Sequence, residues 1–279
     1  MTVEAGDSPE QVAAAMAVDY SRAPITADPD GPLYGMLAQG LALGAPLTVM
    51  HDGTAWNSVY DCGEDDTEDC RYLLTEVWGI GSEEHWLEVI SRLVDGEYGD
   101  SEAYWAVRMR TRARRRLGGP RVDDAAWTAE IASAFTEPEN EKFIEQIASA
   151  IPRVHAAENQ LRAAHLLDSD EEVEHCDAYD YTRAISVARW GVRFGWGTPN
   201  VVPNVAVDVA RRAALDYSSW RAYALGWDLG RIVTYTETWG RQTVQSIEAI
   251  RPLLDSVASP WRNLPFPVPG QWEGDEEPG

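Results

Sequence analysis

Apolar residues recur at helical spacing along most of the chain, and the alternation typical of strands is rare. The clearest case is the segment 179–191, where Tyr181, Ala184, Ile185 and Ala188 occupy positions i, i+3, i+4 and i+7. Such a stripe is what one buried face of a helix requires. The pattern therefore predicts an all-α fold, a compact multi-helix array with about ten helices joined by short loops.

Residues that favour helix ends place several boundaries. Ser82 precedes Glu83 and Glu84 as an N-cap, and Gly79 and Gly96 fit the residue that follows a helix. Further helices are expected over 8–21, 33–43, 101–117, 124–135, 204–217 and 243–257, with a capping box at 136–139 and a break at Pro152.

The segment 47–57 is ambiguous. Its Asp52-Gly53 pair lies between apolar and β-branched residues and fits a short β-hairpin with a type I′ turn. An irregular loop fits the same residues.

The helices are expected to group into three parts. Residues 1–60 are a helical N-terminal extension, 61–262 a helical domain with a candidate subdomain boundary at the acidic loop 168–177, and 263–279 an acidic tail rich in Pro and Gly.

One short pattern occurs twice: an aromatic residue, Asp, two residues, then Arg. Asp and Arg at i and i+3 can pair, and the aromatic residue lies with Arg behind the apolar stripe. Either these faces are buried and the pairs are structural, or they form a recognition surface or a polar cleft. The residues are the polar pairs Asp180, Arg183, Asp228 and Arg231 and the aromatic residues Tyr179, Trp190 and Trp227.

The net charge of the chain indicates which classes of binding partner are favoured. The net charge of -23 disfavours nucleic acid and anionic membranes and suits a basic protein partner. Lys142 is the only lysine, so almost all cations are guanidinium groups, which pair with carboxylates and stack on aromatic rings. There is no secretory leader, membrane-length apolar run or disulfide framework, so the expected location is the cytoplasm.

Tests for known chemistry are negative. Cys62 and Cys70 are spaced too widely for a paired zinc motif, and the loop that starts at Asp168 lacks the glycine and final acid of a calcium loop. No nucleophile elbow or phosphate-binding glycine loop occurs, so no catalytic residue, metal or cofactor is expected. Arginines at 108–116 could contact RNA or phosphate, or be neutralised by acidic loops of the same chain, which we favour.

Several short motifs rich in tryptophan, glycine and arginine follow one another along the chain. They are Trp78-Gly79-Ile80, Trp86, Asp180, Arg183, Arg189-Trp190-Gly191, Trp220, Gly230-Arg231 and Ser259-Pro260-Trp261. Taken in order, over about residues 70–262, they resemble the bacterial domain-of-unknown-function 1266 family. This resemblance implies a cytoplasmic helical protein without an established activity.

These observations favour a non-enzymatic protein-binding module, such as an inhibitor, an immunity protein or an adaptor. The alternative is an enzyme of unknown reaction type whose cleft is lined by the Asp and Arg residues of the two copies. The oligomeric state is open.

Overall fold

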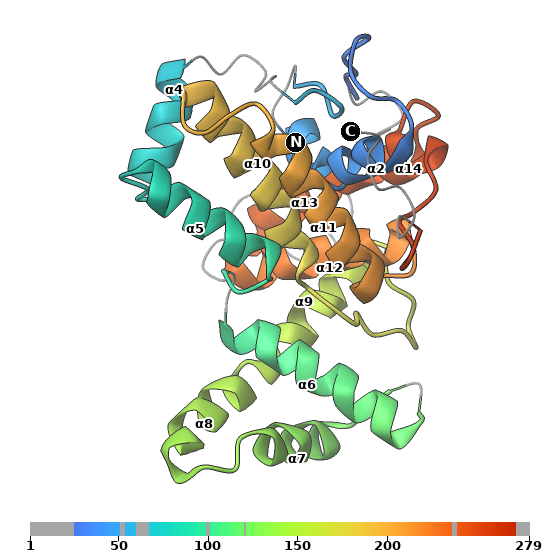
Figure 1. Cartoon of the computed structure of the whole chain (residues 1–279). Coiled ribbons are helices and arrows are strands. Elements are labelled where there is room, and N and C mark those ends of the chain that lie inside the picture. The colour runs from blue at the N-terminus through green and yellow to red at the C-terminus, as the bar shows by residue number, and fades with distance from the viewer. Residues whose placement is uncertain are drawn as a thin grey trace. The chain divides into compact units, whose positions relative to one another are not determined.

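The computed structural model describes residues 25–50, 54–59, 67–98, 101–119, 121–235 and 239–271 (Figure 1), and in these ranges the regular structure is helical. The all-α prediction is confirmed. In chain order the helices are α2 (Gly35–Leu43), α3 (Ala45–Met50), α4 (Thr67–Tyr72), α5 (Glu83–Val94), α6 (Ser101–Leu117), α7 (Asp124–Ala134), α8 (Glu141–Ser149), α9 (Ile151–Ala163), α10 (Ala178–Phe194), α11 (Val201–Asp216), α12 (Trp220–Thr234), α13 (Trp239–Asp255) and α14 (Pro260–Asn263). A π-helical turn, Leu73–Val77, follows α4, and a 3₁₀ turn, Pro138–Asn140, precedes α8.

Several helix ends form as the sequence predicts. The Ser82 side chain accepts a hydrogen bond from the backbone N–H of His85 at 3.2 Å, and α5 begins at the next residue. Gly79 and Gly96 have φ angles of 66° and 68°, the left-handed conformation in which glycine ends a helix at little cost. Pro152 lies in the first turn of α9, so the chain breaks between α8 and α9.

Three local predictions are wrong. Residues 47–50, expected as the first strand of a hairpin, belong to α3, and among the described residues Ala55 forms a β-bridge with Thr26 instead. The helix expected from Asn204 starts at Val201, because Pro203 fits a first turn in which its missing N–H costs nothing. The capping box at 136–139 gives way to the 3₁₀ turn, and α8 starts at Glu141. The helix predicted for 8–21 lies outside the described residues.

Contacts divide the chain into two compact units. Of the described residues, the first unit holds those between 101 and 179 and between 224 and 248, and the second holds those between 25 and 98, between 180 and 223 and between 249 and 271. The chain passes from the first unit to the second between Tyr179 and Asp180, shortly after the acidic loop 168–177. The predicted domain boundaries themselves stay a prediction.

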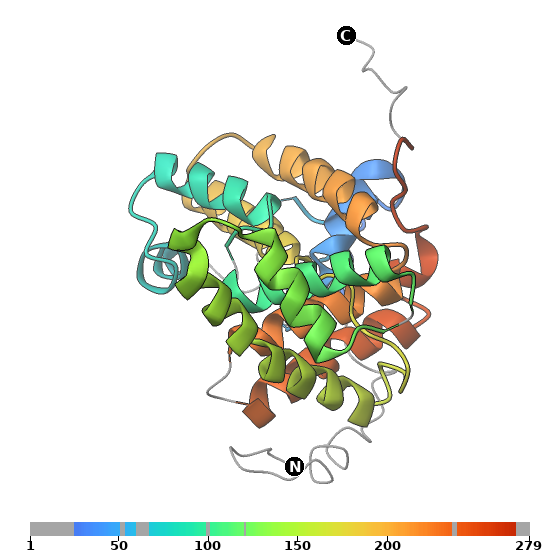
Figure 2. The same ribbon diagram turned by 90° about the horizontal axis from the view of Figure 1, so that it is seen from below.

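In the first unit, α6 packs against α7, α8 and α9 (Figure 2, green to yellow-green). Their apolar stripes form a core around Trp127, whose indole N–H donates to the carbonyl of Ala106 at 2.7 Å. Because the polar edge of this tryptophan is satisfied, the whole ring is buried without an unpaired donor.

In the second unit, α11 packs against α2 and α5. The α2–α11 contact is close because Gly40 has no side chain: a Cβ there would lie 2.3 Å from the carbonyl oxygen of Ala206. Gly191 of α10 likewise admits the ring of Trp86, whose indole N–H donates to Val187 O at 2.8 Å. Glycine at both points lets backbone and ring approach more closely than any other residue would.

Candidate functional site

The first predicted polar pair, Asp180 and Arg183, lies inside the second unit. The two side chains form an ion pair, and Asp180 is fully buried. Asp180 also accepts a hydrogen bond from the backbone N–H of Tyr98 at 3.1 Å. The Arg183 guanidinium lies 5.5 Å from the ring centroids of both Trp78 and Tyr98. This pair is therefore held in an aromatic box by hydrogen bonding and cation–π contact.

Trp190 extends the same box. Its ring is 8% exposed and meets that of Trp78 edge to face, with centroids 6.4 Å apart. Trp78 thus contacts both Trp190 and Arg183, and little of the Trp190 ring is accessible to a partner.

The second predicted pair, Asp228 and Arg231, is buried in the first unit. Arg231 donates to Ser246 Oγ and to Gln245 Oε1, each at 3.3 Å, and its guanidinium lies 6.0 Å from the Trp227 ring centroid. Burial lowers the pKa of Arg231, and the neighbouring Tyr179, Tyr235 and Asp228 oppose that effect. Neutral hydrogen-bond acceptors and aromatic rings therefore hold the Arg231 guanidinium, in addition to the charge of Asp228.

Tyr179 and Trp227 complete this second cluster. Tyr179 donates its hydroxyl hydrogen to the Tyr235 hydroxyl at 3.2 Å, and its ring meets Trp227 edge to face at 5.9 Å. The seven predicted residues thus fall into two buried groups in separate units. Burial is what the structural hypothesis expected, and a functional role for these residues stays a prediction.

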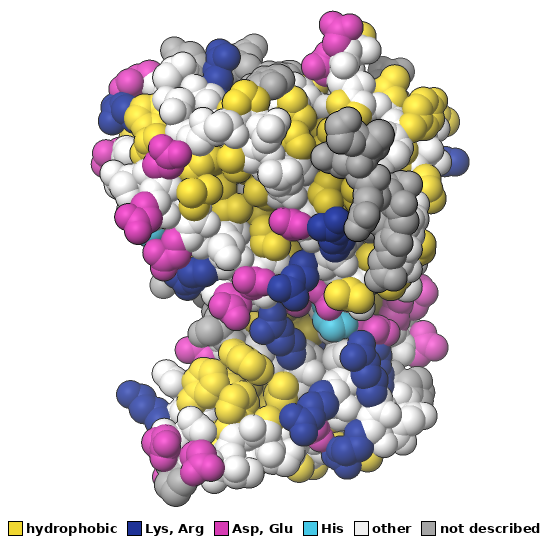
Figure 3. All heavy atoms as spheres, in the orientation of Figure 1, with side chains coloured by type: hydrophobic (Ala, Val, Ile, Leu, Met, Phe, Trp, Pro, Cys, Tyr) yellow, Lys and Arg dark blue, Asp and Glu magenta, His cyan; other side chains and the backbone are white. Residues whose placement is uncertain are grey.

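The arginines of α6 contact acids of the same chain. In Figure 3, Lys and Arg side chains gather over the region that α6 occupies in Figure 1. Arg108 pairs with Asp177 at 2.6 Å, while Arg112 and Arg116 pair with Glu130 at 2.8 and 2.9 Å. Arg108 is thus neutralised by the acidic loop, as expected, whereas the partner of Arg112 and Arg116 is a residue of helix α7 and not of an acidic loop.

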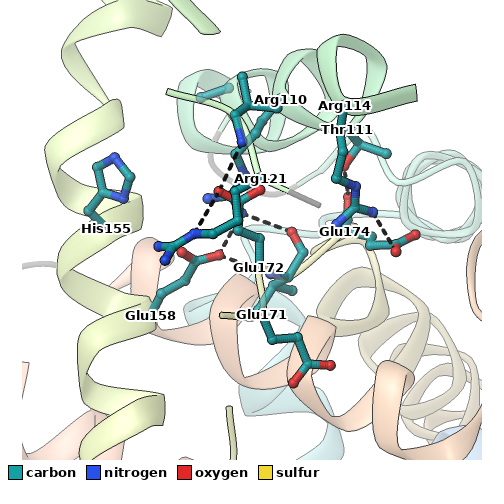
Figure 4. Close-up of polar contacts among 12 residues, drawn as sticks. Arg110, Thr111, Arg114, Arg121, His155, Glu158, Glu171, Glu172 and Glu174 are labelled. Carbon is teal, nitrogen blue, oxygen red and sulfur yellow. Dashed lines mark hydrogen bonds and ion pairs between the residues drawn. The ribbon is translucent and has the colours of Figure 1, made fainter. Parts of the chain in front are cut away.

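Arg110 is the innermost member of this set (Figure 4). It pairs with Glu158 of α9 at 2.5 Å, donates to the carbonyl of Val173 at 2.9 Å and lies 4.7 Å from the Trp127 ring centroid. Glu158 in turn accepts from the N–H of Val173 at 2.9 Å. One Arg–Glu pair therefore fixes the backbone of the acidic loop through both its donor and its acceptor.

Other contacts attach the rest of this loop. Thr111 donates to the carbonyl of Glu174 at 2.6 Å, and Arg162 donates to that of Glu171 at 2.6 Å. Arg121 lies 3.8 Å from Glu172. These contacts attach the acidic loop to α6 and α9. In the described part of the chain, no group of three or more His, Cys, Asp or Glu residues could hold a metal.

An open groove lies between α5 and α11 in the second unit. Its volume is about 530 Å³. Leu87 and Leu215 are 46% and 67% exposed at its edges, and hydrophobic side chains show on this face in Figure 3. The groove is lined by Leu87, Ile90, Ser91, Val94, Asp95, Val205, Asp208, Arg211, Arg212 and Leu215.

Ion pairs occupy the polar rim of the groove. Arg212 of α11 pairs with Asp95 at the end of α5, and so links the two helices. Arg211 pairs with Asp208 one turn away at 3.3 Å. The groove thus combines a floor of apolar stripes with a charged rim, an arrangement that suits an amphipathic helix.

Sequence reasoning missed this groove. The signal in α11 was weak, because Val205 and Leu215 share one side of the helix but the charged Asp208 and Arg212 lie between them. The pattern alone could not reveal that Leu215 is exposed.

A family model described as a protein of unknown function, DUF1266, matches residues 73–266. The chain belongs to the DUF1266 family. No curated protein and no solved structure matches it. In the described part of this DUF1266 protein, no helix is long and apolar enough to cross a membrane.

Motif residues of this DUF1266 protein serve packing. Ser259 caps α14 by accepting from the N–H of Trp261 at 3.0 Å, and the Trp261 indole donates to Ala42 O at 2.8 Å. Trp261 stacks on Trp220 with ring centroids 5.4 Å apart. These motif residues therefore hold α14 against α2 and α12, and the α5–α11 groove also lies within the matched range.

Proposed function

We propose that this DUF1266 protein is a non-enzymatic protein-binding module, and that its α5–α11 groove takes an amphipathic helix from a protein partner. The observation that carries the proposal is the open apolar floor of the groove, with Leu87 and Leu215 at its edges. Roles that such a module could serve are those of an inhibitor, an immunity protein or an adaptor.

The geometry of the two helices supports a helical ligand. Leu87, Ile90 and Val94 form an apolar stripe on α5, and Val205 and Leu215 add two apolar side chains from α11, with charged residues of α11 between them. A third helix along this groove can bury apolar residues at i, i+3, i+4 and i+7. Covering both exposed leucines would contribute about 2 kcal/mol or more to binding.

An enzymatic function finds less support. Its expected polar residues Asp180, Arg183, Asp228 and Arg231 are all buried, with Asp180 and Arg183 bound to each other. The acidity of the whole chain supports binding instead, because a net charge of -23 accelerates the capture of basic partners.

Site-specific photo-crosslinking in the native host tests the groove. A benzophenone amino acid at Ser91, which lines the groove, should yield a discrete adduct with a partner protein. The same probe at Ser149, exposed at the end of α8, is the matched control and should not yield it.

Two substitutions decide whether the adduct depends on the groove. Leu215→Gln should abolish it, and Leu117→Gln, at a leucine 52% exposed on α6, should leave it unchanged. An adduct that survives Leu215→Gln, or that forms equally from Ser149, would contradict the proposal.

A further inference from the structure

The charges on the α11 rim of the groove are neutralised within the protein. Arg211 pairs with Asp208, and Arg212 pairs with Asp95 across the groove. Each of these arginines already has a carboxylate within reach. The α11 rim therefore presents little net charge to a partner.

The α5 rim differs. Glu84 and Glu88 are exposed, and the ion pairs found among the described residues involve neither of them. Arg92 lies one turn after Glu88 but packs over the ring of Tyr98, with its guanidinium 5.2 Å from the ring centroid. The two glutamates thus form an uncompensated acidic edge.

Helix geometry places this acidic edge beside the groove. At 100° per residue, Glu84 and Glu88 share an arc of about 60° with Ser91 and Asp95. Ser91 and Asp95 line the groove. A ligand in the groove would therefore pass close to both glutamates.

We infer that the partner helix carries a row of Lys or Arg residues on one flank, aligned with Glu84 and Glu88, beside the apolar stripe that enters the groove. This inference rests on the proposed function and adds the partner's charge and orientation. Basic residues four apart on the partner match the spacing of the two glutamates, about one helical turn.

Two synthetic helical peptides test the inference by fluorescence anisotropy with the full chain. Both carry leucines at i, i+4 and i+7; one has lysines at two flanking positions four residues apart, and the other has glutamates there. The lysine peptide should bind at least tenfold more tightly, and its affinity should fall as salt increases.

Charge-reversal variants locate the effect. Glu84→Lys with Glu88→Lys should weaken the lysine peptide about five- to tenfold, because two exposed charge pairs are lost and become repulsive. Glu141→Lys with Glu145→Lys is the matched control on α8: both residues are exposed, four apart, and the charge change is the same. Circular dichroism confirms that each variant is folded.

The outcomes separate the two proposals. Equal binding of both peptides, or equal effects of the α5 and α8 reversals, would overturn the acidic-edge inference while the groove remains supported. Binding of neither peptide, or binding unchanged by Leu215→Gln, would refute the groove proposal and the inference that depends on it.

Discussion

The Arg110–Glu158 pair should dominate the stability of the first unit. Both side chains are 1% exposed, and their ion-pair distance is 2.5 Å. Arg110→Met keeps the length and apolar stem of the side chain but removes its charge. Glu158 would then keep its hydrogen bond from the Val173 N–H and its pair with Arg162 at 3.5 Å.

The loss of stability follows from the buried Glu158 carboxylate that Arg110→Met leaves without its main partner. A buried carboxylate that loses its main partner costs about 3–5 kcal/mol. Loss of the cation–π contact with Trp127 adds about 1 kcal/mol. We therefore expect Arg110→Met to lower the free energy of unfolding by about 4 kcal/mol, measured by urea denaturation with circular dichroism.

A double-mutant cycle isolates the pair. Glu158→Gln keeps a side-chain acceptor for the Val173 N–H and should cost about 2 kcal/mol. In that background Arg110→Met no longer leaves a charged Glu158 without its partner, and only the longer pair with Glu172 at 3.9 Å is lost, so its cost should fall by about 2 kcal/mol. Arg211→Met is the control: its pair with Asp208 is about half exposed and should contribute less than about 1 kcal/mol. A cost below about 1 kcal/mol for Arg110→Met, or additive effects in the cycle, would refute this reasoning.

Two further predictions concern the second unit. Gly191→Ala should destabilise the protein by about 2 kcal/mol or more, since the new Cβ would lie 2.1 Å from the Trp86 ring. The control is Gly81→Ala, where a Cβ would meet nothing within 4 Å. Equal midpoints of the two variants in thermal denaturation would contradict the predicted clash. Burial raises the pKa of Tyr223 well above its ordinary value, so the unfolded chain releases this proton first as pH rises. The free energy of unfolding should be unaffected by this group below about pH 10 and fall above it. In urea denaturation at a series of pH values, Tyr223→Phe should reduce that fall. An equal fall in the variant and the unaltered protein would contradict the prediction.

Local sequence signals predicted the ends of helices well where one residue type decides the outcome. Ser82 acts as an N-cap, and Gly79 and Gly96 end helices. The signals failed at 47–50, where β-branched residues suggested a strand but the chain continues as α3. The start predicted for α11 at residue 204 is three residues late, because proline at 203 is suited to the first turn of a helix.

The candidate site was harder to predict, because exposure depends on tertiary packing. The twice-repeated Asp and Arg pattern drew attention, since polar pairs beside aromatic residues are common in functional sites and in buried networks alike. Leu87 and Leu215 did not stand out, because leucine in a helical stripe usually means burial. Only the packing of α5 against α11 shows that these two remain accessible.

The near-absence of lysine helps to explain why the conspicuous Asp and Arg motifs are buried. A guanidinium can pair with a carboxylate and still stack on a ring, so it tolerates burial better than an ammonium group. Arg110 and Arg183 each combine an ion pair with an aromatic ring. In such a chain, an Asp–Arg pair beside tryptophan is weak support for a recognition site. The surface to test is the α5–α11 groove, where the exposed Leu87 and Leu215 lie beside the acidic edge of α5.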